Sequence, residues 1–62
     1  MVEIGRKIKQ YRLQLDLTQE ELAQRTELTK GYISQLENDL CSPSISTLED
    51  ILNILGVTLE EF

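Results

Sequence analysis

Residues 17–33 read LTQEELAQRTELTKGYI, and this stretch contains two helix starts in close succession. Thr18 can cap the backbone N–H of Glu21 while the Glu21 side chain reaches back to Thr18, which is the capping-box pattern. A second cap follows at Thr29, so the helix that begins after Thr18 has room for only about two turns. The sequence therefore predicts two short helices joined by a turn of about three residues, the second over residues 30–38.

Such a short connection makes the two helices cross steeply, so that one polar face of the second helix projects outward. Ile33 and Leu36 of that helix point to the core, together with Leu28 just before it. The opposite face holds Lys30, Gly31, Ser34, Gln35 and Asn38. The pair has the geometry of a helix-turn-helix DNA reader.

The polar face suits the major groove of DNA. Gly31 and Ser34 lack the bulk that would keep a helix out of the groove, whereas Lys30 and Gln35 are long enough to reach base edges. Lysine pairs with the acceptors of guanine, and glutamine can pair with adenine through two hydrogen bonds. Every amphipathic helix has a polar side, so an ordinary solvated face explains the same residues.

Helical periodicity also marks the segment before this unit. Between residues 3 and 15 the apolar Ile4, Ile8, Tyr11 and Leu15 recur every three or four positions, which predicts a helix. After the unit, residues 38–44 contain turn-forming residues and a proline, and they predict a loop.

The last part of the chain predicts one complete helix and the start of another. Ser46 and Glu49 form a capping box, and Gly56 supplies the left-handed residue that closes the helix. The apolar residues of this helix are Leu48, Ile51, Leu52 and Leu55. Thr58 and Glu61 repeat the capping-box pattern, so a fifth helix is expected to begin there. The expected fold is a compact, all-α domain of five helices.

The composition limits the function classes. A chain of 62 residues has room for one domain. It has no histidine and one cysteine, Cys41, so it offers neither a disulfide framework nor a set of metal ligands. Cys41 and the serines have no adjacent base to activate them, and no glycine-rich phosphate loop occurs. We therefore predict that the protein is not an enzyme and that it needs no metal and no cofactor.

The first fifteen residues contain too many charges for a membrane-directed segment. Glu3, Arg6, Lys7, Lys9 and Arg12 lie among isolated apolar residues. This pattern excludes a signal peptide or a membrane span at that place. We predict a cytoplasmic protein with no membrane contact.

The net charge of −5 is unfavourable for a protein that contacts phosphates. The two signs are separated along the chain, however. Residues 1–36 hold six basic and five acidic residues, and residues 37–62 hold six acidic residues and no basic one. One part could therefore approach DNA while the other is kept away from it. An ordinary acidic surface on the last helices explains the acids equally well.

Four parts of the sequence resemble one known family. They are residues 17–24 (LTQEELAQ), Thr29 with residues 32–38 (YISQLEN), the dipeptide Pro43-Ser44 and residues 55–57 (LGV). Together they resemble the Cro/phage-repressor-type helix-turn-helix family, also called XRE-like, over essentially the whole chain. The resemblance implies a lambda-repressor-like DNA-binding domain over residues 1–62, with the helix-turn-helix formed by the second and third helices.

The resemblance also implies roles for individual residues. The positions that would contact bases are Lys30, Gly31, Ser34 and Gln35. The positions that would contact the sugar-phosphate backbone are Thr18, Gln19, Thr29, Tyr32 and Asn38. Phosphate contacts set the register on DNA, and base contacts choose the sequence. Arg12 and Glu37 take the positions of a buried ion pair with a structural role, and two solvated surface charges are the alternative.

Two features depart from the family pattern. Glu27 stands in the turn where the family has glycine, and a left-handed conformation is disfavoured for such a residue by about 1–2 kcal/mol. Basic residues are few, which implies few phosphate contacts per monomer and favours a dimer on DNA. The candidates for the dimer contact are Leu40, Ile54, Leu59 and Phe62. Core positions or scattered surface positions explain these four residues at least as well.

We therefore expect a sequence-specific transcriptional regulator of the bacterial type, a repressor that binds a pseudo-palindromic operator in double-stranded DNA as a homodimer. The residues do not exclude an activator. Because a helix start stands at the end of the chain, we also expect a longer regulator whose C-terminal domain would bind an effector. The alternative is a protein-interaction module, for example an antitoxin-like domain, that uses the acidic C-terminal helices.

Overall fold

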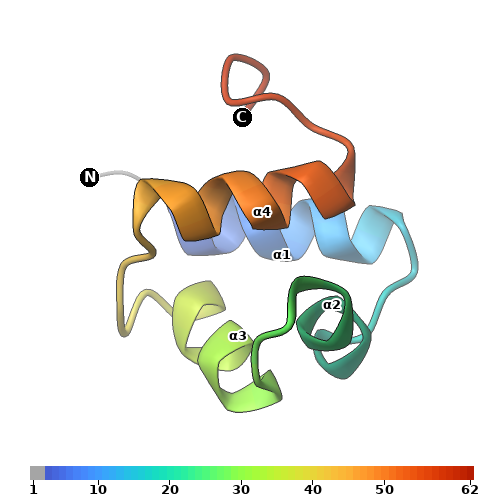
Figure 1. Cartoon of the computed structure of the whole chain (residues 1–62), viewed down its shortest axis with the longest axis vertical. Coiled ribbons are helices and arrows are strands. Elements are labelled where there is room, and N and C mark those ends of the chain that lie inside the picture. Colours follow the sequence, from blue (N-terminus) through green and yellow to red (C-terminus); the bar gives the residue numbers. More distant parts are fainter. Residues whose placement is uncertain (1–2) are drawn as a thin grey trace.

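The structure, a computed structural model, describes residues 3–62 and has four α-helices in that range (Figure 1). They are α1 (Ile4–Gln14), α2 (Gln19–Thr26), α3 (Lys30–Glu37) and α4 (Ile45–Leu55). In Figure 1, α1 and α4 run across one side of the molecule, and the α2–α3 pair lies on the other. The all-α class and the pair of short helices are confirmed. None of the helices in this range is long and apolar enough to span a membrane.

One apolar core joins the four helices. Its most deeply buried side chains are Ile8, Leu22, Ile33, Leu36, Ile51 and Leu52. Each helix contributes to it from positions that the helical spacing places on one face. The expected inward position of Leu15 is wrong, because Leu15 lies beyond the last residue of α1 and is 49% exposed. Asp16 follows with a left-handed φ of 56°, and the chain turns there toward α2.

The two predicted helix starts of the central stretch are confirmed. The Thr18 hydroxyl accepts a hydrogen bond from the Glu21 backbone N–H at 3.0 Å, and the Glu21 carboxylate accepts one from the Thr18 N–H at 2.8 Å. The Thr29 hydroxyl accepts from the Tyr32 N–H at 3.1 Å. Because a helix leaves its first N–H groups without intrahelical partners, these caps define where α2 and α3 begin.

The predicted cap of α4 is wrong. Ser44, not Ser46, is the N-cap, and its hydroxyl accepts from the Thr47 N–H at 3.1 Å. Ser44 has an extended backbone (φ −67°, ψ 163°) directly after Pro43. Both serines have the right chemistry, and starting at Ser44 lets Leu48 N–H bond to the Ser44 carbonyl at 2.9 Å. The predicted closure of this helix by Gly56 is confirmed, since its φ is +75°.

The predicted fifth helix is wrong, so the described residues form a four-helix domain. Thr58 and Glu61 do form the expected capping box, with bonds of 3.0 and 3.2 Å. Only one helical hydrogen bond follows, from Phe62 N–H to the Thr58 carbonyl at 2.9 Å. A single turn fixes several residues for one bond, which is unfavourable without tertiary support. That support comes from Phe62, which packs on α1.

The start of α1 is held by a residue far away in the sequence. Glu3, at the N-cap position, makes no capping bond with its side chain. The Gly5 N–H instead donates to the Asp39 carboxylate at 3.3 Å, from the segment after α3. A Cβ on Gly5 would overlap the carbonyl oxygen of Leu36, so α1 approaches the end of α3 more closely than any other residue type would allow.

Candidate nucleic-acid interface

The turn between α2 and α3 depends on Glu27. This residue ends α2 in the left-handed conformation, with φ 60° and ψ 32°. The next N–H, of Leu28, bonds back to the Ala23 carbonyl at 2.8 Å, and Ala23 is buried in the elbow between the helices. Thr29 then has an extended backbone and begins α3. The chain thus reverses within a few residues and leaves one side of α3 uncovered.

The uncovered side of α3 carries the residues expected to face bases. Lys30, Gly31 and Gln35 are exposed, and Ser34 is half-buried. Gly31 is informative because a Cβ built on it meets no atom within 4 Å among residues 3–62, apart from its chain neighbours and the nearby backbone of α3 itself. The fold therefore gives no internal reason for a glycine at this place. A small residue here leaves open space that none of residues 3–62 fills.

The residues expected to face the DNA backbone lie around this side, and several already have partners. The Thr18 and Thr29 hydroxyls accept the capping bonds, which leaves each hydroxyl proton available to a phosphate. Tyr32 is half-buried against the core. The Asn38 amide donates to the Ser34 carbonyl at 2.8 Å, so one of its two amide protons is used within α3.

Gln19, the first residue of α2, joins a buried polar network. The Arg12 Nε donates to Glu37 Oε2 at 2.6 Å, and Arg12 Nη2 donates to Glu37 Oε1 at 3.0 Å. Arg12 Nη1 donates to the Leu17 carbonyl at 2.7 Å. The Glu37 side chain is only 2% exposed. The ion pair that the resemblance implies is thus present, two-pronged and buried, and it ties the end of α1 to the end of α3.

The Gln19 Nε2 donates to the same Oε1 atom of Glu37 at 3.0 Å. Nothing in the sequence predicted this bond, because it joins residues 18 positions apart on different helices. Beside it lies an open hollow of about 550 Å³ between the end of α1 and the starts of α2 and α3. The hollow is lined by Arg12, Leu13, Asp16, Leu17, Thr18, Gln19, Glu20 and Lys30.

A family model described as helix-turn-helix matches residues 8–62. The chain belongs to the helix-turn-helix family. It is 39% identical to the immunity repressor protein of Bacillus phage phi105 over 54 residues, which are 87% of this chain and 38% of the repressor. It is 40% identical to the HTH-type transcriptional regulator PuuR of Escherichia coli over 58 residues, 94% of this chain and 31% of PuuR.

Among solved structures, the chain is similar to the master regulator for biofilm formation SinR in complex with DNA. The TM-score is 0.86 at 38% identity, over 92% of both chains. The resemblance to the Cro/phage-repressor type is therefore confirmed. This helix-turn-helix domain spans about a third of the length of the phage repressor and PuuR.

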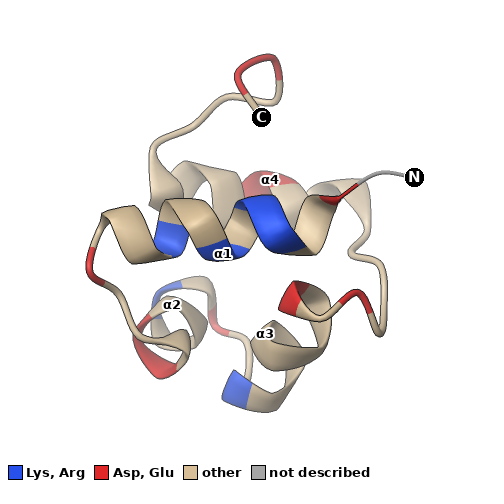
Figure 2. Ribbon diagram, turned by 180° about the vertical axis from the view of Figure 1, so that it is seen from behind, with Lys and Arg blue, Asp and Glu red and all other residues tan. Residues whose placement is uncertain are grey.

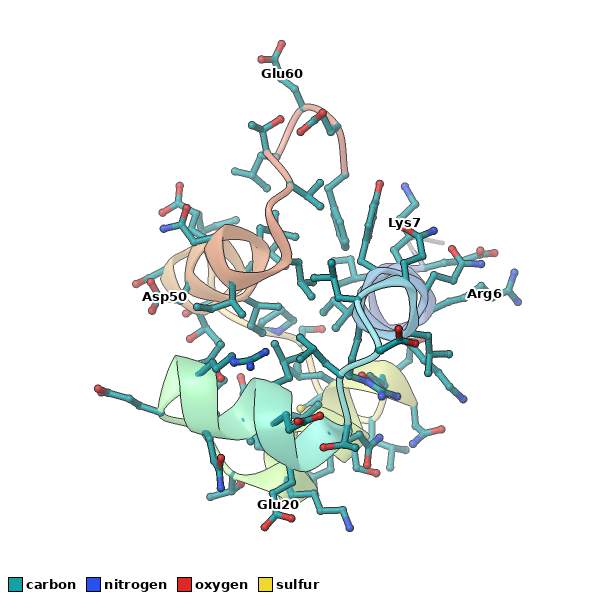
Figure 3. The ribbon with its side chains drawn as sticks, turned by 90° about the vertical axis from the view of Figure 1, so that its right-hand side faces the viewer. Arg6, Lys7, Glu20, Asp50 and Glu60 are labelled. Carbon is teal, nitrogen blue, oxygen red and sulfur yellow. The ribbon has the colours of Figure 1, made fainter. Side chains whose placement is uncertain are left out.

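Charge is distributed unevenly over the helix-turn-helix domain. Figure 2 shows the basic residues on α1, at the end of α2 and at the start of α3. From residue 38 onward the chain has no lysine or arginine. In Figure 3, Glu60 stands at the tip of the C-terminal turn, on the side of the molecule opposite Glu20 of α2. Glu60 thus lies away from α2 and α3, whereas Asp50 of α4 lines a hollow together with Arg25, Thr26 and Glu27 at the end of α2.

One carboxyl group at the start of α2 is shifted by its local contacts. The hydrogen bond from the Thr18 backbone N–H lowers the pKa of Glu21 below its ordinary value of 4.5, and the bond with the Thr18 side chain acts in the same direction. Both contacts favour the ionised form of the carboxyl group. A negative charge at this end of α2 also suits the helix dipole.

The four residues expected at a dimer contact lie on different segments of the chain. Leu40 is 75% exposed and precedes α4, Ile54 lies in the last turn of α4, and Leu59 lies in the segment after it. Phe62 packs within the chain: its ring lies 6.1 Å from that of Tyr11, and Lys7 Nζ donates to its carbonyl at 2.6 Å. Ile45, which is 66% exposed, is a further exposed apolar residue that the sequence pattern did not predict.

Proposed function

We propose that this helix-turn-helix domain binds double-stranded DNA in a sequence-specific way, with α3 in the major groove, and represses transcription by occupying an operator. The observation that carries this proposal is the exposed face of α3, where Gly31 is small for no reason internal to the fold. A close approach of the helix to the floor of the groove supplies the reason. The similar proteins are a phage repressor, a transcriptional regulator and a regulator in complex with DNA.

The contacts divide into two classes. Lys30 and Gln35 read base edges, while Gly31 and Ser34 allow the approach. Backbone contacts come from Thr18, Gln19, Thr29, Tyr32 and Asn38. The N-terminus of α2 favours a phosphate because its first N–H groups point outward and the helix dipole is positive there.

Strong binding to DNA requires a second copy of the domain. With six basic residues against eleven acidic ones, one domain has few charges to place on phosphates. Two copies on a pseudo-palindromic operator in the cytoplasm would double the contacts at half-sites about one helical turn apart. Leu40, Ile54 and Leu59 are the exposed candidates for contact between copies, and Phe62 would first have to leave α1. Because related regulators are longer, an effector-binding domain would lie outside the similarity.

Two alanine substitutions test the division of contacts. Duplexes selected from a random pool by the 62-residue chain give the preferred site, and mobility shifts then measure affinity for that site and for single-base variants. Gln35→Ala should lower discrimination at one base position by about 1–3 kcal/mol. Gln19→Ala should weaken binding to all duplexes alike.

Gln24→Ala is the matched control, because Gln24 is an exposed glutamine of α2 with no proposed contact. It should leave affinity and preference unchanged. Equal effects of Gln35→Ala and Gln19→Ala would overturn the assignment of roles. Failure to retain any duplex at low salt would overturn DNA binding itself and favour a protein-interaction module.

A further inference from the structure

The Glu37 carboxylate does more than pair with Arg12. Its Oε2 atom accepts one hydrogen bond from Arg12, whereas its Oε1 atom accepts two, from Arg12 and from Gln19. The two bonds from Arg12, one to each carboxylate oxygen, close the ion pair between α1 and α3. The additional bond extends this buried group to the first residue of α2, where a phosphate contact is proposed.

The chemistry of the carboxylate fixes which way the Gln19 amide faces. An ionised carboxylate only accepts hydrogen bonds, and both oxygens of Glu37 already accept one from the Arg12 guanidinium. The amide must therefore turn its nitrogen, not its oxygen, toward Glu37. The nitrogen carries two protons in a fixed plane, so binding one of them to Glu37 also sets the direction of the other.

The second proton of this nitrogen has no partner among residues 3–62, and the Gln19 side chain is only partly buried. The neighbouring hollow is open to solvent at the start of α2. A phosphate oxygen is an acceptor, so it can take an N–H but would repel the amide oxygen. An amide turned the other way would face the Glu37 carboxylate with its oxygen, and two acceptors repel each other.

We propose that Glu37 is a positioning residue for DNA binding, which rests on the function proposed above. It holds the Gln19 amide with one N–H directed outward to a backbone phosphate. Because Glu37 ends α3, the same carboxylate links the phosphate contact of α2 to the helix that reads bases. The buried ion pair thereby fixes the register of the phosphate contact relative to the recognition helix, in addition to its structural role.

A double-mutant cycle tests this role. Gln19→Ala, Glu37→Gln and the double variant are compared for binding to a fluorescein-labelled duplex of about 20 base pairs, two helical turns, with Gln24→Ala as control. Circular dichroism sets a temperature at which each variant is folded. Each single change should weaken binding roughly tenfold, as expected for a hydrogen bond to a charged group. The double variant should bind no more weakly than Gln19→Ala.

A negative result can overturn either the positioning role of Glu37 or DNA binding itself, and the experiment distinguishes the two. Glu37→Gln at wild-type affinity, or losses that simply add in the double variant, would overturn the positioning role and leave DNA binding intact. A wild-type chain that binds no duplex would overturn the proposed function, and this role with it.

If Glu37→Gln does not fold, an NMR spectrum of the wild-type chain tests the positioning role of Glu37. In a proton–nitrogen correlation spectrum, the two side-chain protons of Gln19 should be separated further than those of exposed Gln24, because one is bonded to a carboxylate. On addition of the duplex, the other proton should shift. Gln19 signals that coincide with those of Gln24, or that do not respond to the duplex, would overturn the proposal.

Discussion

The two ends of α3 are held in place in opposite ways. At the N-terminal end the contacts are local: Thr29 caps the helix, Glu27 makes the turn, and the Lys30 side chain is exposed. At the C-terminal end they are long-range: Glu37 is buried against Arg12, and Asp39 bonds to Gly5. α3 is therefore anchored by long-range contacts at its C-terminal end. Its proposed base-reading face carries residues that the fold does not require.

The largest effect is expected from breaking the buried anchor. Arg12→Ala leaves the Glu37 carboxylate buried without its partner, which should destabilise the fold by about 3–5 kcal/mol in urea unfolding. Arg6→Ala is the control, because its pair with Glu3 is exposed, and it should cost less than about 1 kcal/mol. Replacing both buried partners by apolar residues, as in R12M/E37L, should restore most of the stability. Equal losses from Arg12→Ala and Arg6→Ala would contradict the comparison.

Alanine at two glycines should act with opposite signs. Gly5→Ala forces α1 away from the carbonyls at the end of α3 and should destabilise the fold by about 1–3 kcal/mol, as overpacking does. Gly31→Ala has open space and should stabilise α3 by about 0.5–1 kcal/mol, because alanine is the better helix former. Thermal unfolding of both variants checks the signs. A loss of stability in Gly31→Ala would mean that the proposed reading face is, after all, required by the fold.

A gain of similar size to that of Gly31→Ala is expected in the turn before α3. Glu27→Gly removes the strain of a side chain at φ 60° and should raise stability by about 1 kcal/mol. Asp16→Gly, at a φ of 56°, is the matched control and should gain less, since aspartate adopts this conformation more readily than glutamate. An unchanged or lower melting temperature of Glu27→Gly would show that the turn is not strained.

The smallest effect concerns the local cap of α2 and depends on pH. Because the Thr18 contacts lower the pKa of Glu21 in the folded state, the unfolded state binds more protons between that pKa and 4.5. The contribution of Glu21 is therefore complete above pH 4.5 and is lost as the pH falls through the folded pKa. Urea midpoints of wild type and Glu21→Gln should converge on acidification. A constant difference between them would contradict this linkage.

Prediction from sequence succeeded where the decisive contacts are local. The caps at Thr18 and Thr29 join residues three positions apart, so the residue types alone identify them. The same reasoning failed at Ser44 and Ser46, because both serines satisfy the local pattern. At Thr58 the expected capping box forms and one helical hydrogen bond follows it, but the described residues contain no fifth helix.

The sequence by itself determined the all-α class, the two short central helices, the left-handed end at Gly56 and the polar face of α3. The left-handed conformation at Glu27 was expected only from the family resemblance. Only the tertiary structure decided that Asp39 holds the start of α1, that Glu37 holds Gln19, and that Phe62 packs on α1. The reason is physical: a cap depends on neighbours within one turn, whereas these contacts depend on how closely two helices approach, which the packing of the whole core sets.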